Sequence, residues 1–364
     1  MGLNDKAEFL FMDIFSIIPV AAITTFIAIL GTYYFCKKFD IVDHPGGRKD
    51  HAGIIPLAGG PALLASLFVG NYLGIQNINW AVLTAACLLV TAGILDDRVG
   101  LRAINKFMIQ SFSAALIVIY GGLAVTTIGI GFIDGLLEND FISQLLTIIA
   151  ITGLINAFNM IDGIDGLCAG LALSCFGFIL FSFPMINSDI NLELIHSFAF
   201  GATAISVFLV FNFNLISGKK IFLGDSGSML IGLLLATTLI QVSEGRWSEN
   251  TFFPASLVLW SLSVPVFDTI STATRRILRG VSPMSPDRTH IHHIFMSSGL
   301  TPLMTLLSIL ALSAFFYAIG LALSLNLGEK LSIFFWFAAF IIYYVIIGIA
   351  RNHFNHTQMT TNKS

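Results

Sequence analysis

Long apolar runs without a charged residue limit most strongly what this chain can fold into. Five of them cover residues 14–36, 107–133, 141–161, 166–188 and 331–350. An α-helix rises about 1.5 Å per residue, so about 20 residues cross the hydrocarbon core of a bilayer, which is roughly 30 Å thick. Only 11% of the residues are charged, whereas a typical soluble domain has about 25%. The sequence therefore predicts an all-α polytopic membrane protein.

The apolar segments predict eleven transmembrane helices. A charge-free stretch at 54–95 is divided by Gln76, Asn77 and Asn79, so we count it as two helices. The expected cores lie at residues 14–36, 54–75, 78–95, 105–128, 141–159, 166–185, 195–216, 223–243, 252–273, 302–325 and 331–350.

The positions of Lys and Arg predict the orientation, because basic residues near span ends are retained in the cytoplasm. With an outer N-terminus, 15 basic residues fall on the cytoplasmic side, and only Lys6, Arg246 and Lys330 fall outside. We therefore expect the N-terminus outside and the C-terminus in the cytoplasm. In this interpretation residues 1–350 form one membrane domain and residues 351–364 form a short cytoplasmic tail. The cytoplasmic loops are expected at about 37–53, 96–104, 157–165, 217–225 and 274–301.

Four polar motifs fall on this one predicted face. The first is the pair Asp96 and Asp97 at the end of the third expected span. A charge that faces lipid costs a few kcal/mol. The pair therefore either lines a polar cavity or emerges into water at the helix end.

The second motif contains Asn156, Asn159, Asp162 and Asp165, which recur every three residues between the fifth and sixth expected spans. On a helix they would form one stripe. Its amides and carboxylates suit sugar hydroxyls, a nucleobase edge or a hard cation. The alternative is a polar loop with turn-forming Asp-Gly steps.

The third motif, Phe-Leu-Gly-Asp-Ser-Gly at 222–227, places Asp225 at the entry of the eighth expected span. Mg²⁺ usually takes one or two protein carboxylates together with substrate phosphates. Aspartate also caps helices well, and the two roles are compatible.

The fourth motif is a histidine loop, in which His290, His292 and His293 follow Asp287 and Arg288. Neutral imidazoles bind transition metals, and imidazolium or arginine neutralises phosphate. A surface loop without a role is the third interpretation.

Basic residues accompany the acidic motifs and suit a doubly phosphorylated ligand. They are Arg48 and Lys49 near His51, Arg102 and Lys106 after the aspartate pair, and Arg275, Arg276 and Arg279 before the histidines. We assign Lys219 and Lys220 to topology alone.

The sequence contains no P-loop, dinucleotide fingerprint, nucleophile elbow or His-Glu-x-x-His motif. Because the ATP-binding P-loop is missing, we expect a phosphate reaction that needs no ATP, in which one phosphoanhydride is exchanged for another.

These residues resemble the polyprenyl-phosphate N-acetylhexosamine-1-phosphate transferases, the glycosyltransferase 4 or MraY-like superfamily. The resemblance covers Pro-Leu-Ala-Gly-Gly at 56–60 and the four polar motifs, in order. The spaced histidines and Arg98 directly after the aspartates resemble the WecA type. The MraY type has a contiguous histidine run and takes a muramyl-peptide nucleotide, so we do not expect a role in peptidoglycan precursors.

The resemblance implies transfer of an N-acetylhexosamine 1-phosphate, GlcNAc-1-phosphate first among them, from its UDP-sugar to undecaprenyl phosphate, with release of UMP. The product would start an envelope polysaccharide of the O-antigen, common-antigen or teichoic-acid type. The implied location is the bacterial inner membrane, with the active site on the cytoplasmic side. The implied partners are the UDP-sugar and the lipid, without nucleic acid, and a homodimer is left open.

The resemblance also implies roles for individual residues. The implied metal is Mg²⁺, or Mn²⁺, on Asp225 and Asn156. The implied catalytic residues are Asp96, Asp97 and Lys106, where either aspartate acts as the base or forms a covalent intermediate. The implied substrate-binding residues are Asn159, Asp162, Asp165, Phe222, Arg276, His290, His292 and His293.

Two alternatives from other classes remain. A multi-span transporter would have the same apolar composition, although transporters usually hold their substrate near the bilayer midplane. A CDP-alcohol phosphotransferase also uses carboxylates and Mg²⁺, but its Asp-Gly-x-x-Ala-Arg signature is missing after both Asp162 and Asp165.

Overall fold

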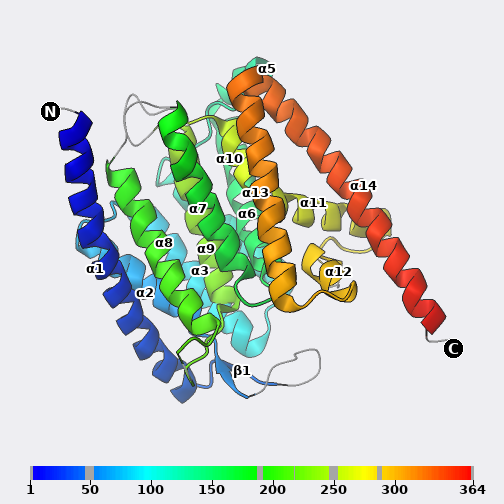
Figure 1. Ribbon diagram of the computed structural model, residues 1–364, viewed down its shortest axis with the longest axis horizontal. Coiled ribbons are helices and arrows are strands. Elements are labelled where there is room, and N and C mark those ends of the chain that lie inside the picture. Colours follow the sequence, from blue (N-terminus) through cyan, green and yellow to red (C-terminus); the bar gives the residue numbers. More distant parts are fainter. Residues whose placement is uncertain are drawn as a thin grey trace.

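The computed structural model describes residues 3–45, 53–186, 192–216, 218–245, 253–284 and 289–361. Within these residues the chain forms fourteen helices and one pair of short antiparallel strands (Figure 1). The strands are β1 (Val42–Asp43) and β2 (Ile55–Pro56). The helices are α1 (Leu3–Lys38), α2 (Gly59–Tyr72), α3 (Trp80–Val99), α4 (Ala103–Ile119), α5 (Gly131–Leu137), α6 (Asp140–Ile161), α7 (Leu167–Ile186), α8 (Leu192–Asn212), α9 (Gly224–Ser243), α10 (Ala255–Ser261), α11 (Ser263–Leu278), α12 (Ile291–Ser297), α13 (Pro302–Leu327) and α14 (Glu329–Thr361).

The helices confirm an all-α polytopic membrane protein. Eight of those described, α1, α3, α6, α7, α8, α9, α13 and α14, are long and apolar enough to cross a membrane. Each of the other expected cores also carries a helix or a helix pair, but α2 has 14 residues and α4 has 17. Both are shorter than the roughly 20 residues of a full crossing. The count of eleven crossings and the orientation therefore stay predictions.

The expected span at 252–273 is not one straight helix. It divides into α10 and α11, whose axes differ by 71°, with Leu262 between them. Pro265 lies in the first turn of α11, where its missing N–H is tolerated, whereas a helix continuing through this point would lose a hydrogen bond. In Figure 1, α11 runs across the bundle beside α12, while α10 is upright among the long helices.

Two further boundaries differ from the expected ones. The predicted loop at 274–301 contains the end of α11 and all of α12. The predicted tail begins inside α14, which continues to Thr361. A polar sequence after an apolar span can extend the same helix, because its backbone hydrogen bonds remain local.

Helix α9 lies at the centre of the bundle. In its most apolar stretch, 83% of the residues are buried. It contacts α2, α3, α6 and α7. A helix that is apolar all round is typical of such a central position. Since Asp225 lies in its first turn, the sequence places that carboxylate at the end of the most enclosed helix.

Two glycines let α2 and α3 approach the first turn of α9 closely. A Cβ on Gly60 would lie 2.5 Å from the backbone nitrogen of Gly227, and a Cβ on Gly93 would lie 2.2 Å from the Cα of Ser226. Any side chain would force the helices apart. The Gly59-Gly60 pair therefore allows α2 to pack directly against the helical turn that carries Asp225.

The polar motifs gather at one end of the bundle. In Figure 1, β1 and the α12 region lie at the lower end, whereas α5 and the N-terminus of α1 lie at the upper end. The backbone nitrogen of Phe222 donates to the carbonyl of Pro56 (2.9 Å), and that of Gly59 donates to the carbonyl of Phe222 (3.0 Å). These bonds join the segment around β2 to the segment that leads into α9.

Candidate active site

One lysine joins two carboxylates that are far apart in the sequence. Lys106 Nζ, in the first turns of α4, donates to Asp96 Oδ2 (2.6 Å) and to Asp225 Oδ2 (2.5 Å). The backbone nitrogen of Leu101 also donates to Asp96 Oδ1 (2.5 Å). All three charged side chains are mostly buried, so the ion pairs are screened less than surface pairs. The C-terminal end of α3 and the N-terminal ends of α4 and α9 thus meet at Lys106.

Asp97 points to the other side of the same turn. Its Oδ1 accepts a hydrogen bond from the backbone nitrogen of Asp225 (3.2 Å), and its buried Oδ2 has no partner among the described residues. A Cβ on Gly224, where φ is 70°, would lie 2.7 Å from this Oδ2. Asp97 therefore interacts with the N-terminus of α9, which favours negative charge, and keeps one free acceptor.

The carboxylate of Asp225 does not cap its own helix. It lies in the first turn, and its oxygens bind Lys106 and the amide of Asn159, the latter at 3.0 Å. Asn159 also donates to Ser228 Oγ (3.0 Å). The described contacts thus direct Asp225 toward the charged cluster.

The predicted Asn/Asp stripe is interrupted, because α6 ends at Ile161 and Asp162 is its C-cap. Asn156 and Asn159 lie on the helix, but only Asn159 bonds Asp225; the amide of Asn156 lies 3.1 Å from the sulfur of Met160. The prediction paired Asn156 with Asp225 at a metal, whereas the structure brings Asn159 to that carboxylate. Spacing alone could not distinguish two amides one turn apart.

Asp162 is half-buried beside the other acids. Burial first, and then the negative charges of Asp225, Asp97 and Asp165, raise its pKa well above the ordinary value. Burial penalises the charged form, and the neighbouring carboxylates add to this penalty.

Asp165 belongs to a neighbouring ion pair. Its Oδ2 accepts from Lys220 Nζ (2.5 Å), and this ammonium lies 5.1 Å from the ring centre of Phe222. The sequence predicts a topological role alone for Lys220. The structure also gives it a place between two predicted substrate-binding residues, and the signal that we missed was its position two residues before Phe222.

The histidine loop is held by a buried aspartate. Asp268, 1% exposed, accepts through Oδ2 from His290 Nδ1 (2.7 Å), and its Oδ1 accepts from the backbone nitrogen of Ile291 (2.9 Å) and the hydroxyl of Tyr343 (3.2 Å). Asp268 lies outside the four polar motifs of the sequence. The missed signal was a lone carboxylate inside an expected span, which requires a partner or a function.

His292 connects this loop to the acidic cluster. It is buried, and a Cβ on Gly163 would lie only 2.0 Å from its Nε2. Burial, together with the neighbouring His293, lowers the pKa of His292 to about 3, so the ring is neutral at physiological pH. The rings of His292 and His293 lie 4.1 Å apart, and those of His290 and His292 lie 6.0 Å apart. His292 therefore reaches the turn that follows α6.

Arg276 is also buried, and its Nη1 donates to the carbonyl of Pro283 (2.6 Å). This contact ties the end of α11 to the chain before the histidines. The predicted neighbours Arg48, Lys49 and His51, and also Asp287 and Arg288, lie outside the described residues.

The chemistry of the donors fits Mg²⁺. Asp97, Asp162 and Asp225 supply hard carboxylate oxygens, one of which is buried and unpartnered, and Mg²⁺ prefers such ligands. Within the described ranges, no three His, Cys, Asp or Glu side chains already form a metal-binding group. Substrate phosphates would therefore have to complete the coordination, as is usual for this ion.

Comparison with known proteins identifies the family of this chain. The family described as Glycosyl transferase family 4 matches residues 79–243. A Yersinia pestis protein named undecaprenyl-phosphate alpha-N-acetylglucosaminyl 1-phosphate transferase is 34% identical over 81% of this chain and 79% of its own length. The protein of the same name from Escherichia coli strain K12 is 33% identical over 78% of this chain and 77% of its own length. By this similarity the chain belongs to glycosyl transferase family 4, among the undecaprenyl-phosphate N-acetylglucosaminyl 1-phosphate transferases.

Proposed function

We propose that this protein transfers GlcNAc-1-phosphate from UDP-GlcNAc to undecaprenyl phosphate and releases UMP. The observation that carries the proposal is the contact of Lys106 with both Asp96 and Asp225, beside the unpartnered oxygen of Asp97. Membership of the family gives the substrates. The product would be the first lipid-linked intermediate of an envelope polysaccharide.

In the proposed reaction, an oxygen of the lipid phosphate bonds to the sugar-linked phosphorus of UDP-GlcNAc. The bond from this phosphorus to the bridging oxygen breaks, and UMP leaves with that oxygen. Asp97 would orient the lipid phosphate and take its proton, because Asp96 is already paired with Lys106. A positioned base contributes about 10²–10⁴-fold to such a step.

Asp225, with Asp162 or the Asn159 amide oxygen beside it, would hold Mg²⁺. When bound, the ion would neutralise the pyrophosphate and the charge that develops on UMP. Lys106 would then turn from the carboxylates to the phosphates, since its ammonium is the cation that Asp96 and Asp225 share. Phosphoryl transfer depends mainly on such positioning and charge compensation.

The remaining residues would bind the nucleotide and the sugar. The ring of Phe222 would stack on uracil, with Lys220 and Asp165 beside it. His290, His292, His293 and Arg276 would hold phosphate and sugar. The neutral His292 can offer one donor and one acceptor, which suits sugar hydroxyls.

The acceptor chain would lie in a groove between α3 and α4. This groove has a volume of about 600 Å³, and its lining includes Thr91, Leu95, Met108 and Phe112. Leu95 directly precedes Asp96, and Met108 follows Lys106 by two residues. A prenyl chain in this groove would bring its phosphate to the Asp96–Lys106 pair while the tail stays in the bilayer.

We further propose eleven crossings in the bacterial inner membrane, with the N-terminus outside, the C-terminus in the cytoplasm and the site at the cytoplasmic surface. The 15 to 3 distribution of basic residues supports this orientation. UDP-sugars are cytosolic, which agrees with it.

The proposal is tested with purified protein in lipid nanodiscs, undecaprenyl phosphate and a panel of radiolabelled UDP-N-acetylhexosamines. We expect lipid-linked label from UDP-GlcNAc, equimolar UMP, and loss of both on chelation, with recovery after Mg²⁺ is added. UMP release without lipid would favour the covalent aspartyl route. Full transfer by an Asp225→Ala variant would contradict the proposed site. The absence of lipid-linked label and UMP with every donor in the panel would overturn the proposal and favour the transporter alternative.

A further inference from the structure

Three lysines gather where the C-terminal end of α1 meets the segment between α8 and α9. Lys37 and Lys38 lie in the last turn of α1, and Lys219 lies in the segment that follows α8. In Figure 1 the C-terminal end of α1 is near the lower end of α8, at the end of the bundle that also carries β1. We call these three side chains, together with Tyr33 and Tyr34, the α1 lysine surface.

Two tyrosines of α1 fix the position of Lys219. Tyr33 is 5% exposed, and its hydroxyl donates to the carbonyl of Gly218 (3.0 Å). Gly218 has a φ of 76°, a conformation that favours glycine, so the chain can turn at this residue. Lys219 Nζ then donates to the hydroxyl oxygen of Tyr34 (3.1 Å). The ammonium group of Lys219 is therefore held against α1.

Two ammonium groups share the ring of Tyr33. Lys37 Nζ lies 4.5 Å from the centre of this ring, and Lys219 Nζ lies 5.5 Å from the same centre. These distances limit the separation of the two nitrogens to at most 10 Å. The ring attracts each cation, but two like charges within about a Debye length repel each other. An anion beside both ammonium groups would relieve this repulsion.

The described residues supply no such anion. Within the described ranges, no lysine of the α1 lysine surface has a carboxylate oxygen within 4.0 Å. The carboxylates that follow in the same segments have other partners. Asp40 Oδ1 lies 3.7 Å from His44 Nε2, and Asp165 accepts from Lys220 (2.5 Å). The surface therefore carries an excess of positive charge.

Exposed aromatic side chains border these charges. Tyr34, Phe35 and Phe39 are all exposed. The ring centres of Phe35 and Phe39 lie 4.6 Å apart, and Lys38 Nζ lies 5.8 Å from the ring centre of Phe39. Exposed aromatic rings beside lysines are typical of the level where a membrane protein meets lipid headgroups. The surface thus suits a ligand that is both anionic and apolar.

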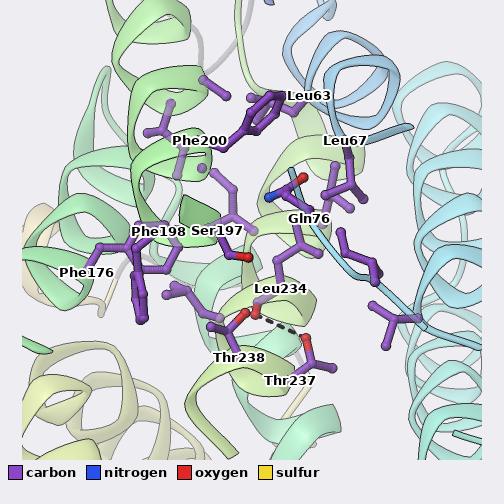
Figure 2. A pocket seen from close by; sticks show the side chains of 18 of the residues that line it. Leu63, Leu67, Gln76, Phe176, Ser197, Phe198, Phe200, Leu234, Thr237 and Thr238 are labelled. Atoms are coloured by element: carbon purple, nitrogen blue, oxygen red, sulfur yellow. Dashed lines mark hydrogen bonds between the residues drawn. The ribbon is translucent and has the colours of Figure 1, made fainter. Parts of the chain in front are cut away.

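Helix α8, which leads to Lys219, is fixed on two sides. It packs along α1, where the rings of Phe26 and Phe211 lie 5.5 Å apart. Figure 2 shows Phe198 of α8 beside Phe176 of α7, and Phe200 of α8 beside Leu63 of α2, around an internal cavity of about 90 Å³. Such a cavity has room for water molecules only. A lipid would therefore have to bind outside the bundle, as it can at the α1 lysine surface.

We propose that the α1 lysine surface binds the headgroup of an anionic membrane phospholipid of the phosphatidylglycerol class. The phosphate lies at the ammonium groups of Lys37 and Lys219. The Tyr34 hydroxyl, whose oxygen accepts from Lys219, donates its own proton to a phosphate oxygen. The acyl chains contact the exposed rings of Phe35 and Phe39. Basic pockets between transmembrane helices are typical sites for anionic headgroups.

The test measures lipid binding to the full-length protein in detergent micelles by native mass spectrometry. Phosphatidylcholine is the control lipid, because it carries the same phosphate with a compensating cation. We expect the first phosphatidylglycerol to bind about tenfold more tightly than the first phosphatidylcholine. One lysine near an anionic headgroup corresponds to about a fivefold change in Kd. The double variant Lys37→Gln, Lys219→Gln should therefore raise the Kd for phosphatidylglycerol about 25-fold and leave phosphatidylcholine binding unchanged.

Two further variants separate this surface from general attraction to cations. The double variant Lys37→Arg, Lys219→Arg keeps both charges and should keep the Kd within a few-fold. Arg279→Gln is the matched control, because Arg279 is an exposed cation at the end of α11, away from α1 in Figure 1. It should leave the Kd unchanged. Circular dichroism and gel filtration confirm that each variant is folded.

Three outcomes would overturn the proposal: equal affinity for the two lipids, unchanged phosphatidylglycerol binding in the double glutamine variant, or an equal loss of binding in Arg279→Gln. A competition experiment then distinguishes the source of the phosphate. Displacement of phosphatidylglycerol by an equimolar amount of undecaprenyl phosphate would assign the surface to the proposed acceptor and overturn the phospholipid assignment. Retention of phosphatidylglycerol would support it. The assay does not depend on transferase activity.

Discussion

Asp96 and Asp97 are adjacent in sequence but differ in their contacts. Asp96 is paired with Lys106 and with a backbone N–H, whereas Asp97 keeps a buried oxygen without a partner in the described structure. The difference arises because successive residues on a helix point about 100° apart. Only one of the two carboxylates is therefore free to accept a proton.

This difference gives the first prediction. Asp97→Asn should lower kcat by about 10²–10⁴-fold and leave the KM for UDP-GlcNAc within a few-fold. Asp96→Asn removes an anchor of Lys106, so it should raise that KM as well. Steady-state kinetics of both variants provide the comparison. Wild-type kcat in Asp97→Asn would exclude this residue as the base.

The second prediction concerns Asp162 and pH. Because the folded protein raises the pKa of this carboxyl, the folded state binds its proton more tightly than the unfolded state does. Above the ordinary pKa of Asp, about 4, ionisation therefore costs stability as pH rises. Asp162→Asn should raise Tm by a few degrees at pH 8 without Mg²⁺, and by less at pH 5.

Mg²⁺ supplies the control for this prediction. If Mg²⁺ compensates the negative charge of the acidic cluster, it should raise the Tm of the wild-type protein more than that of Asp162→Asn. The difference in Tm between the two proteins should then narrow. Thermal unfolding followed by intrinsic fluorescence measures this gap. A lower Tm for Asp162→Asn at pH 8 without Mg²⁺ would show that charge repulsion does not dominate at this residue.

Asp268 leads to a third prediction, as a positioning residue for His290. Asp268→Asn replaces a carboxylate that accepts three hydrogen bonds. A hydrogen bond to a charged group contributes about 1.5–3 kcal/mol, so we expect kcat/KM to fall about 10- to 100-fold and its pH profile to change. Tyr343→Phe removes only one of the three bonds and serves as the milder control. An unchanged pH profile in Asp268→Asn would indicate a purely structural role.

Helices α3 and α4 together form the apolar groove, and α3 also carries Asp96 and Asp97 at its C-terminal end. Thr84, Leu88, Thr91 and Leu95 face outward on α3 at intervals of three or four residues, which form one helix face. The sequence pattern contains this face, but only the packing of α4 beside it forms the groove.

The fourth prediction tests that groove. Thr91→Trp should raise the KM for undecaprenyl phosphate about tenfold, a loss of about 1.4 kcal/mol, and leave the KM for UDP-GlcNAc unchanged. Thr91 is exposed, so the protein should fold normally. Ile149→Trp, an exposed position on α6 outside the groove, is the control. Equal lipid KM values for both variants would locate the acceptor chain elsewhere.

The arrangement of the complete bundle determines which solvent each end meets. The loop after α1 carries Asp40 near β1, and Glu138 follows α5 at the other end; both are exposed. If the proposed orientation is right, these two residues lie on opposite sides of the membrane. This separation can be measured directly.

The fifth prediction uses single cysteines in a Cys87→Ser background, since Cys36, Cys168 and Cys175 are buried. In intact cells stripped of their outer membrane, an impermeant maleimide should label Glu138→Cys and not Asp40→Cys. Inverted vesicles should give the reverse pattern. Labelling of both cysteines from the same side would overturn the proposed topology and the cytoplasmic site.

The membrane class, the order of the motifs and the family were already readable from the linear chain. Hydrophobicity is a local property, and a helix in lipid must satisfy its own backbone, so apolar runs such as 331–350 predict helices without knowledge of their neighbours. The central position of α9, in contrast, depends on the glycines of α2 and α3 that contact it.

Packing in three dimensions decided everything that depends on where side chains from different helices meet. It brought Asn159 rather than Asn156 to Asp225, gave His290 its partner Asp268, bent the chain between α10 and α11, and left Gln76 without a partner in a cavity. Each outcome depends on helix rotation and crossing within about one turn. Residue spacing along one helix holds no information about the rotation of the next helix, and this is the physical reason why the sequence left these contacts open.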